Sequence, residues 1–139
     1  MTIKKYAVGE GVLTVGPPET AQVMTAQIEE AHIEWSEDVP DARKVLSGEE
    51  LQQKAKYTAT LTGTVIQDLS DAGLVEWTWT HKGETHPFTF SPAAATGREI
   101  TGDLRVGPLD VGGEVDEDAP TSDLSWACIG EPVLGASLT

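Results

Sequence analysis

The stretch from Lys56 to Pro92, KYTATLTGTVIQDLSDAGLVEWTWTHKGETHPFTFSP, decides how this chain folds. In its first part the apolar residues Tyr57, Leu61 and Val65 fall between threonines that occupy every second position. Successive side chains of a strand point to opposite faces, and β-branched threonine suits a pleated surface. The alternation therefore predicts a strand with one apolar face and one uncharged polar face.

A short helix is expected next, across residues 69–83. Asp68 or Ser70 can cap its start, and Gly83 is a natural stop. Four apolar side chains would share one helical stripe: Leu69, Ala72, Val75 and Trp79. A β-hairpin across residues 75–90 is the alternative, because residues 75, 77 and 79 also alternate with polar ones. The stop signals at both ends favour the helix, which leads into a short strand at residues 87–90.

The composition indicates one domain with a single core. The chain has 139 residues, of which 39% are hydrophobic, so some apolar surface is expected to be buried only on assembly. It contains no run of 18 apolar residues and no secretory signal, so we expect no membrane segment. Cys128 is the only cysteine, and its apolar neighbours predict a packed, unreactive side chain.

The formal net charge of −14 argues against binding to nucleic acid. DNA-binding proteins need basic patches that displace counterions, and no such patch is visible. An acidic protein repels DNA, which suits a conduit through which DNA must slide, but the same charge also keeps a protein soluble. Composition by itself favours the second explanation.

The remaining strands are expected at residues 11–15, 22–35, 99–106 and 124–129. The second of these needs a bulge near Glu29–Glu30, because Ile28 is out of phase with Ala31, Ile33 and Trp35. These strands predict a mainly β fold: an antiparallel β-sandwich or barrel with one short α-helix and a long inter-strand loop. The single domain, 1–139, would carry an extended N-terminal arm at about 1–10 and a C-terminal tail at about 131–139.

The long loop, at about 36–54, gathers charged residues between two strands, and residues 49–54 could form a helical turn. A connection of this length is uncommon in a compact domain and is usually functional or mobile. It also holds much of the chain's basic charge, including Arg43 and Lys44. From the residues alone, docking on an acidic surface of another copy and a disordered loop are equally good explanations.

Catalytic and metal-binding motifs are not found in the sequence, and we expect no enzyme activity, no cofactor and no metal. Glu30, His32 and Glu34 share one strand face, but alternate strand residues lie roughly 7 Å apart, too far for convergent ligands. His81 and His86 flank Glu84 in a predicted turn, which we interpret as an ordinary surface pair.

Three segments carry a family resemblance. The run TGTVIQDLSDAGLVEWTWTHKGETHPFTFSP at 62–92 resembles the major tail tube proteins of long-tailed, non-contractile bacteriophages of actinobacteria. The ending LSWACIGEPVL at 124–134 and the early GEGVLTVG at 9–16 are similar to the same group. The resemblance implies a virion structural protein, made in the host cytoplasm, that assembles into stacked hexameric rings.

The resemblance also implies partners and surfaces. The partners would be other copies of the chain and the tail-tip, tape-measure and tail-terminator proteins, while genomic DNA passes through the lumen without specific binding. The polar faces of two strands would line that lumen, with the candidates Glu30, His32, Glu34, Thr58, Thr60, Thr62 and Thr64. The long loop would reach the neighbouring ring, with the candidates Asp38, Asp41, Arg43, Lys44, Glu49 and Glu50.

The opposite strand faces and the helix are expected to form the core. Its candidates are Ile33, Trp35, Tyr57, Leu61, Val65, Val75, Trp79, Phe88, Phe90, Trp126 and Cys128. Two alternatives to the tube remain: a monomeric β-sandwich binding module, which would need exposed aromatic side chains, and another phage tail or connector component.

Overall fold

A computed structural model describes residues 3–17 and 21–135 of the chain. The strands are β1 (Val12–Val15), β2 (Gln22–Val23), β3 (Ile28–Asp38), β4 (Arg43–Lys44), β5 (Glu50–Leu51), β6 (Lys56–Ile66), β7 (Thr85–Ser91), β8 (Ile100–Arg105) and β9 (Thr121–Leu134). One α-helix, α1 (Leu74–Thr80), and two short 3-10 turns, η1 (Thr25–Gln27) and η2 (Ala94–Thr96), complete the elements. The predicted mainly β class with one short helix is confirmed.

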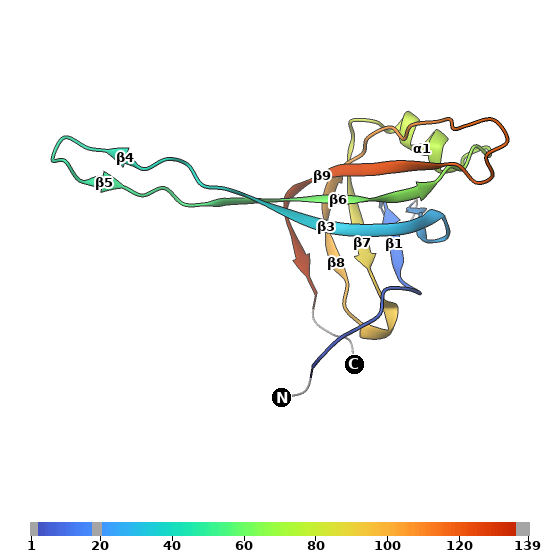
Figure 1. Cartoon of the computed structure of the whole chain (residues 1–139), viewed down its shortest axis with the longest axis horizontal. Helices are drawn as coiled ribbons and strands as arrows, with labels where there is room; N and C mark the ends of the chain where they lie inside the picture. The colour runs from blue at the N-terminus through green and yellow to red at the C-terminus, as the bar shows by residue number, and fades with distance from the viewer. Residues whose placement is uncertain (1–2, 18–20, 136–139) are drawn as a thin grey trace.

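Seven strands form one antiparallel sheet in the order β2-β1-β7-β8-β9-β6-β3. The first half of β9 pairs with β6 over Thr121–Ala127, and its second half pairs with β8 over Cys128–Leu134. β9 therefore belongs to both halves of the sheet, whose strands run in steeply crossing directions in Figure 1. Such a corner strand lets a single sheet fold over its own apolar face.

The pairing of β3 with β6 sets which side chains face the core. Ile33 lies opposite Leu61, and Ala31 lies opposite Gly63, so the apolar residues of both strands share one face. The register shifts between Ile28 and Glu30, which confirms the predicted bulge. The extra residue restores the phase of the alternation and brings Ile28 against the core.

The core lies between the two sheet halves and the helix. It is formed by Leu13, Val15, Met24, Leu61, Val65, Leu74, Val75, Phe88, Phe90, Leu104, Val106, Leu109, Leu124 and Trp126. Ile33 and Cys128 pack against this cluster and are partly buried. Thr78 is fully buried on α1, where its hydroxyl donates to the Val75 carbonyl at 2.9 Å and accepts from the Leu109 amide at 3.3 Å.

Three expected core residues are instead exposed. Trp35 is 54% exposed, Tyr57 49% and Trp79 50%. Trp35 and Tyr57 lie on the apolar face of the β3–β6 pair, but at the end where these strands extend beyond the body of the domain. Of the predicted stripe only Val75 is buried on α1, beside Leu74 and Thr78: Leu69 and Ala72 precede the helix, and Trp79 is half exposed.

The helix is confirmed over the hairpin, but its expected cap is wrong. Gly73 occupies the N-cap position without a side-chain cap. Asp68 instead accepts hydrogen bonds from the amide and hydroxyl of Ser70, and the Ser70 hydroxyl bond is the main cause that lowers the pKa of the Asp68 carboxyl. The Ala72 amide donates to the Glu76 carboxylate at 2.6 Å, which supports the first turn from within the helix.

Two further expectations about strands are wrong. Residues 49–54 contain β5 rather than a helical turn. β9 continues through Gly130 and Pro132 to Leu134, although these residues were expected to end the strand. Pro132 is tolerated because the pairing of β8 with β9 shifts register between Thr101 and Asp103. Pro132 has no amide hydrogen to donate, and at this irregular point no regular strand–strand hydrogen bond is lost.

Beyond the body, β3 and β6 continue as a two-stranded ribbon that projects far to one side (Figure 1). We call residues 39–55 the arm. Its tip is a small hairpin in which β4 pairs with β5, with Lys44 opposite Glu50 and Arg43 opposite Leu51. The expected loop therefore contains a small two-stranded sheet of its own.

The close approach of β3 to Gly63 makes a testable prediction. A Cβ added at Gly63 would collide with the Glu30 carbonyl oxygen at the bulge. We expect Gly63→Ala to lower the free energy of unfolding by about 1–3 kcal/mol, as over-packing does elsewhere. Urea unfolding measures this, with Thr58→Ala on the exposed face as the control. Equal stability of both variants would contradict the close approach.

Candidate functional site

A continuous polar surface covers the outer side of β3, β6 and the first half of β9. The β3–β6 register places Glu30 opposite Thr64, His32 opposite Thr62 and Glu34 opposite Thr60. The β6–β9 register adds Asp123 beside Thr64 and Ser125 beside Thr62. All seven lumen candidates, including Thr58, therefore lie on one face, which we call the polar face. This arrangement follows from the alternation, and it leaves their role a prediction.

The polar face is rich in hydroxyls and carboxylates. Glu30, His32 and Glu34 are exposed, and the His32 ring lies 2.7 Å from the Glu30 carboxylate. At the positions named above, every ionisable side chain except His32 is acidic. Carboxylates outnumber basic side chains on this face, to which Lys56 also belongs by the same alternation, so the surface repels a polyanion.

Five of the six predicted inter-ring residues lie on the arm, and the sixth, Asp38, lies at its base on β3. Asp38 ends β3 opposite Lys56, and Asp41, Arg43, Lys44, Glu49 and Glu50 lie on the arm itself, all exposed. Three basic and three acidic residues make the arm neutral, so the rest of the chain carries the whole net charge of −14. No basic side chain of the arm forms an ion pair with another described residue.

Exposed apolar side chains accompany these charges. Leu46 at the tip is fully exposed, and Val39, Val45 and Leu51 are each about half exposed. Trp35 and Tyr57 extend this apolar surface to the base of the arm. Exposed apolar side chains therefore accompany the arm from its base to its tip.

The end of the body opposite the arm has complementary features (Figure 1). An acidic loop at 110–118 contains Asp110, Glu114, Asp116, Glu117 and Asp118 and no basic residue. Beside it, a shallow groove on α1 is lined by Leu69, Val75, Trp79 and Val111, with Asp71 and Glu76 at its margin. The molecule thus presents a neutral arm with unpaired basic residues at one end and an acidic, partly apolar surface at the other.

Hydrogen bonds hold the loop and the groove in place. The Trp79 indole donates to the Leu109 carbonyl at 2.7 Å, and the Ser122 hydroxyl donates to the Asp110 carbonyl. The Gln67 side chain donates to the Gly112 carbonyl at 2.9 Å and accepts from the Gly112 amide at 3.1 Å. These bonds fix the start of the acidic loop on the body, and the Gln67 amide, which donates to the Pro120 carbonyl at 2.9 Å, fixes the chain just past its end.

The exposure of the aromatic residues and the groove on α1 were not predicted from the sequence. The amphipathic alternation runs unbroken from Tyr57 to Val65, so nothing in it shows where the core ends. The length of the strands could have predicted this exposure. β3 and β6 each have 11 residues, which is longer than a second layer of short strands can cover.

Two other features bear on function. Burial raises the pKa of the Cys128 thiol, which fits a packed, unreactive side chain.

In the part of the chain that the structure describes, no helix has the length and apolar character needed to cross a membrane.

Two chains of solved assemblies are similar in structure. A chain from the virion of the native gene transfer agent (GTA) particle aligns with a TM-score of 0.61, over 89% of this chain and 95% of that chain, at 17% sequence identity. A chain from the tail of the empty GTA particle, with C6 symmetry, gives a TM-score of 0.62 over 90% and 95%, at 16% identity. Neither a protein-family model nor a curated protein sequence matches the chain. This chain shares the fold of those GTA chains across nearly its whole length.

The arm is expected to be dispensable for folding, because no core residue lies between 39 and 55. We predict that replacing residues 39–55 with Asn-Gly, a two-residue hairpin turn, keeps the unfolding midpoint within about 4 °C of the parent. Thermal unfolding followed by circular dichroism tests this. The replacement leaves the net charge at −14, so a large loss of stability would mean that the arm supports the body through contacts.

Proposed function

We propose that this protein is the building block of a phage-type tail tube, a conduit through which a genome is delivered. The observation that carries the proposal is the similarity of fold to a chain of the GTA tail, which covers 90% of this chain and 95% of that one. The sequence resemblance to major tail tube proteins of long-tailed actinobacterial phages supports the same conclusion independently. The role is structural rather than catalytic.

The open edges of the sheet favour ring formation. β3 is the end strand of the sheet, and no described strand pairs with its outer side. The first half of β9 pairs with β6 on one side only, because β8 pairs with the second half. Unpaired strand edges are templates for another chain. We infer that β3 of one copy pairs with Thr121–Ala127 of the next, which would join the inner sheets into a closed barrel.

In such a ring the polar face would line the lumen. The core occupies the opposite side of β3, β6 and β9, so a barrel built from these strands has one side available for its interior. Carboxylates and hydroxyls there would let DNA pass without binding. The C6 symmetry of the similar GTA tail supports six subunits per ring.

Stacking of rings would use the arm. Its unpaired basic residues and exposed apolar tip complement the acidic loop and the α1 groove at the opposite end of the molecule. Because the two surfaces differ, the contact is head-to-tail and repeats without limit along an axis. A separate terminator would stop growth and a tape-measure protein would set the length. Tail-tip proteins would start the tube, and the assembled product would be part of the virion.

A monomeric binding module is the second candidate. Trp35 and Trp79 are half exposed, and exposed aromatic rings are what a carbohydrate-binding surface needs. However, Trp77 is only partly exposed and Trp126 is buried. Trp35 shares its sheet face with the half-exposed Tyr57, whereas Trp79 lies on α1, so the exposed tryptophans do not form one platform.

Electron microscopy of the purified protein at near-physiological salt tests the proposal. We expect hollow tubes or stacked rings from the parent chain and, at most, single rings when residues 39–55 are replaced with Asn-Gly. The replacement removes the stacking surface but no core residue. Tubes of normal length from this variant would contradict the role of the arm. Particles that stay monomeric even with tail-tip proteins present would favour the binding module.

Cysteine labelling of assembled tubes tests the lumen assignment. In a Cys128→Ala background, Ser125→Cys places a thiol at an exposed position of the polar face. In tubes we expect this thiol to react with a small maleimide but not with a polymer maleimide too large to enter. The unassembled protein should react with both.

The matched control is Thr101→Cys, at an exposed position in the other half of the sheet. Reaction of the Ser125→Cys tubes with the large reagent would place the polar face outside. Protection from both reagents would place it in a subunit contact.

A further inference from the structure

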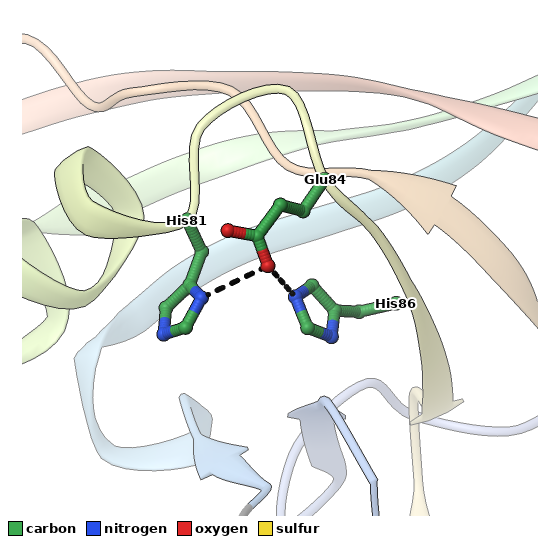
Figure 2. Close-up of side chains that lie close together, drawn as sticks. All are labelled: His81, Glu84 and His86. Atoms are coloured by element: carbon green, nitrogen blue, oxygen red, sulfur yellow. Dashed lines mark hydrogen bonds and ion pairs between the residues drawn. The ribbon is translucent and has the colours of Figure 1, made fainter.

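Three side chains with metal-binding atoms converge where α1 meets β7 (Figure 2). His81 follows the last helical residue, Glu84 lies in the turn, and His86 is the second residue of β7. The carboxylate oxygen Oε1 of Glu84 lies 3.2 Å from Nδ1 of His81 and 3.1 Å from Nε2 of His86. One ligand atom from each of the three residues lies within 4.8 Å of the other two.

Backbone hydrogen bonds hold this turn in a fixed shape. Gly83 has a φ of 83°, and its amide donates to the Val106 carbonyl at 2.8 Å. The Val106 amide returns a bond to the Glu84 carbonyl at 2.8 Å, and the Glu84 amide donates to the His81 carbonyl at 3.0 Å. The turn is therefore fixed to the end of β8 before any ligand binds.

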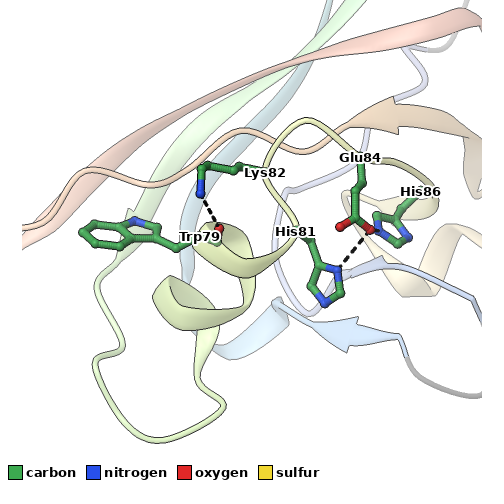
Figure 3. A network of polar contacts seen from close by, with 5 residues as sticks. All are labelled: Trp79, His81, Lys82, Glu84 and His86. Carbon is green, nitrogen blue, oxygen red and sulfur yellow. Dashed lines mark hydrogen bonds and ion pairs between the residues drawn. The ribbon is translucent and has the colours of Figure 1, made fainter.

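The surroundings leave the three ligand atoms available on one side. The Trp77 ring lies 4.8 Å from the His81 ring and 5.6 Å from the His86 ring, centroid to centroid, and forms an apolar wall. His86 shares its strand face with the buried Phe88 and Phe90, so its side chain is only 16% exposed. Lys82 points away from the cluster and donates to the Trp79 carbonyl at 3.2 Å (Figure 3).

We propose that His81, Glu84 and His86 form a binding site for a divalent transition-metal ion, of which Zn²⁺ is the best match. Two imidazole nitrogens and one carboxylate oxygen are a donor set that zinc accepts, at about 2.0–2.2 Å from each atom. Ca²⁺ and Mg²⁺ prefer oxygen ligands, and each binds a larger number of oxygen atoms. The fourth position would be open to water or to a group from another chain.

Binding would draw together three ligand atoms that now lie within 4.8 Å of one another. The two histidines must present lone pairs, so the proton of His81 would reside on Nε2 and that of His86 on Nδ1. Rotation about the side-chain bonds then brings the ligand atoms around one point. The bound ion would tie the end of α1 to the start of β7.

Calorimetric titration of untagged protein with ZnCl₂ at neutral pH tests the site. We expect one Zn²⁺ per chain, and a rise in the unfolding midpoint that EDTA reverses. Because Trp77 borders the cluster, Cu²⁺ should quench tryptophan fluorescence with the same stoichiometry. Absence of saturable binding, or equally strong binding of Ca²⁺, would overturn the proposal.

Variants identify the ligands. Glu84→Gln and His81→Ala should each weaken Zn²⁺ binding more than about tenfold. The loss of a side chain that binds the metal directly should reduce the affinity more than the loss of a residue that only supports such a ligand. The matched control is His32→Ala, which removes the third histidine of the chain, 2.7 Å from Glu30 on the polar face. Equal loss in this control, or unchanged affinity in both cluster variants, would overturn the assignment. Glu84→Gln preserves the shape of the side chain, so the test does not depend on a disruptive substitution.

Discussion

The antiparallel pairing of β3 with β6 is the constraint on which the rest of the structure depends. Its register, with Ile33 opposite Leu61 and His32 opposite Thr62, separates the two strands into an apolar and a polar face along their whole length. A slip by one residue would turn every side chain of one strand to the wrong face. The bulge at Ile28–Glu30 and the close approach at Gly63 define this register at one end. The paired strands continue as the arm at the other.

Alternation along the chain predicted the fold, the polar face and the bulge, because these depend on the period of a strand alone. Burial was harder to predict. Trp35 and Leu61 follow the same pattern on the same face, but one is 54% exposed and the other is fully buried. The difference lies in how far the second half of the sheet extends beneath the strand. That distance depends on β7 and β8, which are distant in sequence.

The helix and the candidate metal site illustrate the same limit at shorter range. The residues between Asp68 and Gly83 predict a helix, but the helix starts only at Leu74, and Trp79 is half exposed although Val75, one turn earlier, is buried. His81, Glu84 and His86 are visible in the sequence as scattered polar residues. They converge only because the end of the helix, the turn at Gly83 and the face of β7 that holds Phe88 act together. No one of these features determines the arrangement.

The corner strand β9 has a mechanical consequence. Hydrogen bonds between antiparallel strands run perpendicular to the strands. A pull along the arm is directed along β6, so it loads the β6–β9 bonds from Thr60 to Ile66 in shear, all together, rather than opening them one after another. β9 passes this load to β8 through its second half. The arm and the body would therefore resist tension as one mechanical unit. A column of such molecules could bend or stretch without its subunits unfolding.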